Sequence, residues 1–78
     1  MSDVQSRVYT IICNQLGVSM HQLDPIAAFK ENLGADSLAI AELLLALEQE
    51  FRLAIPTEQA ERIQTVGDAV SYISRYAR

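Results

Sequence analysis

Residues 36–51 of the chain read DSLAIAELLLALEQEF, and their pattern is the clearest indication of the fold class. Its large apolar residues recur every three or four positions, which is the spacing of one face of an α-helix. That face comprises Ile40, Leu43, Leu44, Leu47 and Phe51. We predict a helix from about Ser37 to Glu50 or Phe51, about 21 Å long, with Asp36 as its N-cap. A face this broad makes the helix the central packing element of a small domain.

Two leucines of this stretch lie outside the apolar face. Leu38 and Leu45 fall on the side of the helix that carries Glu42, and they lie close to Glu48. Single exposed leucines are common in soluble proteins. Two of them bracketed by acids favour a docking ridge for a partner protein.

The chain before this stretch predicts a first helix. Val4, Val8, Ile11, Ile12 and Leu16 have helical spacing. Ser2 or Asp3 is available as the N-cap, and Gly17 occupies the position at which a C-terminal glycine is expected.

Residues 17–36 form a long connection between these helices. Residues 19–22 (SMHQ) have the form of a capping box, and Asp24-Pro25 reads as a turn. Gly34 is expected to relieve a tight approach of the backbone. The apolar residues that we predict to pin the connection onto the core are Leu23, Ile26, Phe29 and Leu33. Connections of more than about 12–15 residues are often functional.

Downstream, Pro56 ends the preceding segment, and residues 57–62 are predicted to form one short helical turn. Residues 65–68 (TVGD) are a second capping-box pattern, which opens a last helix. The inner positions of that helix are Val66, Ala69, Val70 and Ile73. The fold class is therefore all-α: a four-helix bundle with three main helices, one short helix and a long first loop. We expect residues 1–78 to form a single domain.

Size and charge exclude several functions. A domain of 78 residues has little interior for both a core and a catalytic pocket, which favours a carrier or binding module over an enzyme. The net charge of −4 indicates neither nucleic acid nor an anionic membrane as a partner. Cys13 and His21 are single residues of their types and predict no metal site. With neither a signal peptide nor a membrane span in the sequence, we expect a cytoplasmic monomer.

The negative charge is concentrated in the middle of the chain. From Glu31 to Glu61 there are seven acids and one base, a net charge of −6, whereas the remaining residues sum to +2. Such a segment suits basic surfaces on partner proteins.

Ser37 is the residue on which chemistry is expected. A serine at the start of a helix has its hydroxyl near unpaired backbone N–H groups and the positive end of the helix dipole. These features suit a phosphate attached to it. Capped helices beginning Asp-Ser are common, so the residues alone do not decide whether the serine is modified.

The surrounding sequence closely resembles bacterial acyl carrier proteins of the type II fatty acid synthase kind. The resemblance rests on residues 33–38 (LGADSL), Glu42-Leu43 and residues 46–51 (ALEQEF). It extends to residues 15–18 (QLGV), Phe29, Ile55-Pro56 and Thr65-Val66, and it covers residues 4–76 without a gap.

This resemblance implies a carrier and not an enzyme. A phosphopantetheinyl transferase would attach 4′-phosphopantetheine to Ser37, and the thiol of that arm would carry acyl groups as thioesters. Asp36 and Leu38 would be read by the transferase. Glu42, Leu45 and Glu48 would dock onto basic patches of acyl-transferring enzymes and of fatty acid or polyketide synthase enzymes. The acyl chain would enter a cavity lined by Phe29, Leu47, Ile55 and Ile63.

The pathway and the cargo remain open at this point. Ala39, Gln49 and Arg52 depart from the family's more acidic pattern, which favours a specialised lipid or polyketide pathway over housekeeping fatty acid synthesis. The alternatives are a peptidyl, aryl or aminoacyl carrier, and an acidic docking module that carries nothing. Ala35-Asp36-Ser37-Leu38 also resembles a serine esterase signature, but the only histidine, His21, lies in a loop and no strand is predicted.

Overall fold

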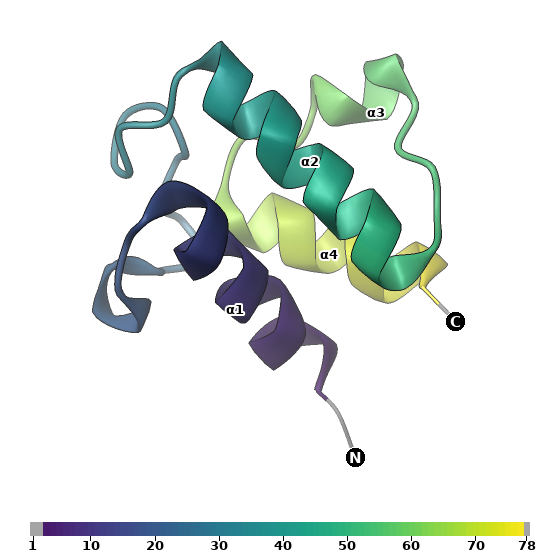
Figure 1. The fold of residues 1–78 in the computed structure, drawn as a ribbon, viewed down its shortest axis with the longest axis horizontal. Helices are drawn as coiled ribbons and strands as arrows, with labels where there is room; N and C mark the ends of the chain where they lie inside the picture. The colour runs from purple at the N-terminus through teal and green to yellow at the C-terminus, as the bar shows by residue number, and fades with distance from the viewer. Residues whose placement is uncertain (1–2, 78) are drawn as a thin grey trace.

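A computed structural model describes residues 3–77, and within them the fold is helical (Figure 1). The elements are α1 (Val4–Leu16), the single 3-10 turn η1 (Met20–Gln22), α2 (Ser37–Phe51), α3 (Thr57–Ala60) and α4 (Val66–Tyr76). Figure 1 shows α1 and α4 on one side of the long α2 and the short α3 on the other, beside the first half of α2. α1 packs against both α2 and α4. The described residues contain no strand, only one isolated bridge between Ala28 and Thr65. The predicted bundle is confirmed.

Each long helix begins at a capping side chain that the sequence predicts. The Asp3 carboxylate accepts a hydrogen bond from the Gln5 N–H at 3.2 Å, while Ser2 lies outside the described residues. Thr65 and Asp68 bond reciprocally at the start of α4. The chain leaves α1 at Gly17, where φ is +68°, a left-handed conformation that glycine adopts without steric cost.

The core lies where α1, α2 and α4 meet. Its fully buried side chains are Val8, Ile12, Phe29, Leu43, Leu47, Val66, Ala69 and Ile73. No polar or charged side chain of the described residues is buried with them. Phe29 therefore fixes the middle of the long connection in the same core that the helices share.

The connection is also tied to the segment before α4 through the backbone. Phe29 N–H donates to Gln64 O at 3.0 Å, and Val66 N–H donates to Ala27 O at 3.0 Å. Gly67 N–H donates to Pro25 O at 2.9 Å, and a Cβ on Gly67 would lie 2.8 Å from that oxygen. Position 67 therefore requires glycine, because any side chain would collide with the Pro25 carbonyl.

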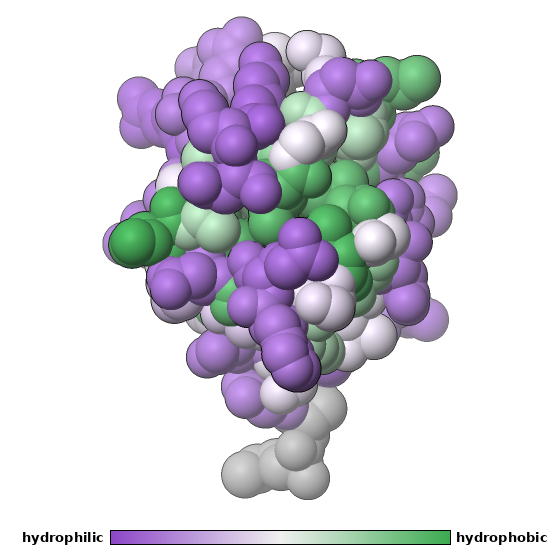
Figure 2. Space-filling model, turned by 90° about the vertical axis from the view of Figure 1, so that its left-hand side faces the viewer, coloured by the Kyte–Doolittle hydropathy of each residue, from purple (hydrophilic) through white to green (hydrophobic). Residues whose placement is uncertain are grey.

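Two expectations about the connection are wrong. Ile26 does not pin the connection onto the core, because its side chain is 82% exposed. The Asp24 carboxylate accepts from the Ile26 N–H and the Asp24 carbonyl accepts from the Ala27 N–H. This turn directs Ala27 into the core in place of Ile26. Figure 2 faces this side of the molecule and shows apolar atoms at the surface among polar ones. Gly34 does not relieve a close approach of the backbone, because a Cβ there would meet no atom within 4 Å. Glycine suits this position because its φ is +70°, in the left-handed region.

Candidate functional site

Ser37 is the first residue of α2, and its side chain is exposed. The Asp36 carboxylate accepts a hydrogen bond from the Ala39 N–H at 2.8 Å, and the Asp36 carbonyl accepts from Ile40 N–H at 3.0 Å. Among the described residues, the N–H groups of Ser37 and Leu38 have no protein acceptor. Two free donors therefore lie at the positive end of the helix, beside the serine hydroxyl.

A groove of about 470 Å³ lies between α2 and α3, and Ser37 is among the residues that line it. It is lined by Lys30, Glu31, Ser37, Ile40, Ala41, Leu44, Thr57, Ala60, Glu61, Ile63 and Gln64. Its apolar residues come from both helices and from the segment after α3, whereas its charged residues come from the connection and from the end of α3. A flexible group attached to Ser37 would thus have an apolar surface directly beside it.

Of the four residues predicted to line a cavity, only Ile63 lines this groove. Phe29 and Leu47 are fully buried, and Ile55 is buried as well, so these three belong to the packed core. The sequence reasoning missed Ile40, Ala41 and Leu44 as lining residues. They lie three, four and seven positions after Ser37, which places them on the same helix face as the serine. That spacing was the signal available for finding them.

The predicted docking ridge is exposed in three of its four positions. Leu38 and Leu45 are 67% and 53% exposed, and Glu42 is exposed between them. Their spacing puts them on one strip of α2. Docking onto this strip stays a prediction, and the structure provides the accessible side chains for it.

Glu48 has a different environment from Glu42. Its carboxylate accepts a hydrogen bond of 2.6 Å from the Ile55 N–H, in a partly buried setting. Tyr72, on α4, donates its hydroxyl to the carbonyl of Ala54 at 3.3 Å. Burial raises the pKa of the Tyr72 hydroxyl, with smaller contributions from Tyr76 and from the Glu48 charge. Glu48 and Tyr72 together hold residues 52–56, the loop that leads into α3.

The residues around Ser37 fit a phosphodiester-linked prosthetic group. The hydroxyl is accessible, two free N–H groups can face a phosphate, and the groove offers room for an attached chain. Within residues 3–77, no group of three or more His, Cys, Asp or Glu side chains is placed to hold a metal ion. No helix among these residues is long and apolar enough to cross a membrane.

Comparison with known proteins gives concordant matches. A family model described as phosphopantetheine attachment site matches residues 6–73, which include Ser37. A solved structure from Mycobacterium tuberculosis, described as "a putative acyl carrier protein (Rv0033)", superposes with a TM-score of 0.88 at 27% identity, covering 95% of this chain and 99% of that one. The acyl carrier protein from Enterococcus faecalis superposes with a TM-score of 0.80 at 39% identity, covering 95% and 94% of the two chains.

Proposed function

The chain belongs to the acyl carrier proteins with a phosphopantetheine attachment site, and we propose that Ser37 is the residue that bears the phosphopantetheine. Members of this family are carriers and not enzymes. The observation that carries the proposal is the position of Ser37: it is exposed, it is the first residue of its helix, and it lines the groove.

The residues around Ser37 have separate tasks in this proposal. The bound group supplies a terminal thiol on a flexible arm, to which acyl groups are attached. The N–H groups of Ser37 and Leu38 would bind the phosphate, and Asp36, which fixes the helix start, would present a carboxylate to the transferase. Ile40, Leu44 and Ile63 offer apolar contact to an acyl chain, which lowers its exposure to water.

The partners include synthase and transferase enzymes in general. We propose that they dock on Leu38, Glu42 and Leu45 through basic patches, with apolar contact from the two leucines. The protein is expected to be a monomer, because the apolar faces of α1, α2 and α4 are buried against one another. Cargo from a fatty acid or a related specialised lipid or polyketide pathway is the proposed class.

Intact-protein mass spectrometry tests the attachment site. The wild type and Ser37→Ala are incubated with coenzyme A, Mg²⁺ and a broad-specificity phosphopantetheinyl transferase. We expect a phosphopantetheine-sized gain in mass for the wild type and none for Ser37→Ala. A gain in both would move the attachment to another residue. No gain in either, with several transferases, would leave a docking module that carries nothing.

Cargo class is a separate question with its own measurement. Mass spectra of the loaded protein purified from its native host should contain acyl forms. Aminoacyl forms in their place would make the chain a peptidyl or aminoacyl carrier, without changing the attachment residue.

A further inference from the structure

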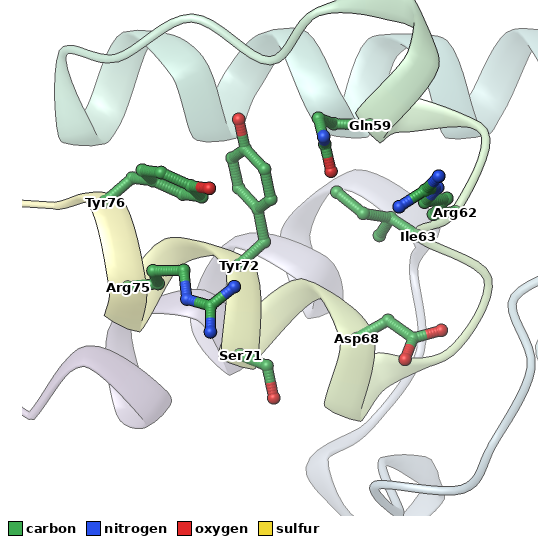
Figure 3. Close-up of a pocket in the computed structure, with 8 residues that line it drawn as sticks. All are labelled: Gln59, Arg62, Ile63, Asp68, Ser71, Tyr72, Arg75 and Tyr76. Atoms are coloured by element: carbon green, nitrogen blue, oxygen red, sulfur yellow. The ribbon is translucent and has the colours of Figure 1, made fainter.

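A second hollow, of about 330 Å³, lies between α3 and α4 (Figure 3). It meets the groove at Ile63, whose side chain lines both spaces. The proposed carrier function uses none of the polar side chains in this hollow. Its chemistry differs from that of α2, because arginine and tyrosine dominate it.

Five side chains that line the hollow have uncommitted hydrogen-bond donors. They are Gln59, Arg62, Ser71, Arg75 and Tyr76. The side chains that do donate hydrogen bonds within residues 3–77 are Ser6, Arg7, Thr10, Ser19, Gln64 and Tyr72. The hollow is therefore rich in donors that face solvent.

The hollow is also positively charged on an acidic protein. Among the described residues, Arg7 forms an ion pair with Glu50, whereas neither Arg62 nor Arg75 has a carboxylate within ion-pair distance. The one acid that lines the hollow is Asp68, and its Oδ2 already accepts from the N–H groups of Gln64 and Thr65. Two arginines and one committed carboxylate leave a net positive site.

The arrangement fits an extended ligand better than a compact ion. Figure 3 shows Arg62 and Arg75 at opposite ends of the hollow, with Ile63 and Tyr72 between them. The rings of Tyr72 and Tyr76, with centroids 4.6 Å apart, form an aromatic wall beside Arg75. Tyrosine and arginine are among the residue types enriched at the energetically important positions of protein interfaces.

We propose that this hollow is a second docking surface, which binds an extended acidic segment of a partner protein. Alternate side chains of an extended chain point the same way. A segment with acid, apolar residue and acid at every second position would place its carboxylates on Arg62 and Arg75 and its apolar side chain on Ile63 and Tyr72. Carboxylates form bidentate hydrogen bonds with arginine. The surface has the opposite charge to the α2 ridge, so the two recognise different partner surfaces.

The probe is the capped peptide Ser–Glu–Ser–Leu–Ser–Glu–Ser, titrated into the ¹⁵N-labelled full chain. We expect saturable shifts at the amides of Arg62, Ser71 and Arg75. The matched peptide with glutamine in place of glutamate should bind at least about tenfold more weakly, a difference of about 1.4 kcal/mol. The double variant Arg62→Gln/Arg75→Gln should bind the acidic peptide more weakly by a similar factor. Arg52→Gln, which lies outside the hollow, should bind it as the wild type does.

Three outcomes would overturn the proposal. They are shifts that map to α2, equal binding of the acidic and neutral peptides, and saturable binding of inorganic phosphate without binding of the peptide at equal ionic strength. The last result would identify a small-anion site in place of a docking surface. The inference does not depend on the attachment at Ser37, because the same titration on Ser37→Ala should give the same shifts.

Discussion

Asp36 combines a structural and a recognition role that two substitutions can separate. Its carboxylate caps α2 through the Ala39 N–H. Asparagine caps helices about as well as aspartate, whereas alanine lacks the acceptor. We expect Asp36→Ala to lower the free energy of unfolding by about 1 kcal/mol and Asp36→Asn to change it little.

Loading by the transferase should respond differently from stability. If the transferase reads the charge, Asp36→Asn lowers kcat/KM for loading although its urea midpoint matches that of the wild type. Equal kcat/KM for loading of Asp36→Asn and the wild type would show that Asp36 acts only as a helix cap.

Arg52 is the one non-glycine residue within 3–77 with a positive φ, at +54°. It ends α2 in the left-handed conformation that glycine usually occupies. A Cβ in this conformation costs about 1–2 kcal/mol, whereas glycine loses about 0.5–1 kcal/mol more backbone entropy on folding. Arg52→Gly should therefore raise the free energy of unfolding by about 0.5–1 kcal/mol. Arg52→Ala keeps the Cβ and is the matched control, since it should show no such gain in urea denaturation. A gain of equal size in both variants would point to the arginine charge as the cause.

At the scale of elements, the loop into α3 depends on groups from two other helices. α3 has four residues and buries none of them, so its neighbours hold it in place. Glu48 from α2 and Tyr72 from α4 bind the adjacent backbone groups of Ile55 and Ala54. The position of this wall of the groove therefore depends on these hydrogen bonds together with the buried side chains of Ile55 and Ile63 on either side of α3.

Removing the Glu48 carboxylate should loosen that wall. Glu48→Ala leaves the Ile55 N–H without its acceptor, which costs about 1–3 kcal/mol. Native-state hydrogen exchange should show faster exchange at Ile55 and through α3. Glu42→Ala, on the exposed strip of the same helix, should change stability by no more than about 0.5 kcal/mol. Equal effects of the two substitutions would show that the bond to Ile55 contributes nothing to the position of α3.

At the scale of the whole molecule, the parts that could be predicted are those that act locally. Asp3, Asp36 and Thr65 cap the helix that each precedes, so a few residues suffice to place each start. Ile26 was misplaced because a bonded turn at Asp24, and not hydrophobicity, sets its direction. The acceptor role of Glu48 and the far wall of the α2–α3 groove arise where separate elements meet. Periodicity along α2 can indicate the lining residues that share the face of Ser37, but it cannot indicate the groups that come from another element.

The charge distribution is also a property of the whole molecule, and it predicts how the carrier meets its partners. Residues 31–61 carry a net charge of −6, opposed by +2 on the rest of the chain. A basic partner should be steered towards α2 over a distance set by ionic screening, which shortens from about 10 Å at 0.1 M to about 3 Å at 1 M salt. The rate of encounter should therefore fall with salt more than the rate of the chemical step.

Transferase loading tests this steering. Raising the salt from 0.1 to 1 M should lower kcat/KM about tenfold or more while kcat changes little. Glu42→Gln should reduce kcat/KM at low salt and match the wild type at high salt. Asp3→Asn removes an equal charge at the N-terminus of α1, outside the α2 strip, and asparagine keeps the helix cap. Its kcat/KM should therefore match that of the wild type at every salt concentration. If Asp3→Asn and Glu42→Gln behave alike, net charge and not the α2 strip governs docking. If kcat/KM does not respond to salt, apolar contact at Leu38 and Leu45 is what selects the partner.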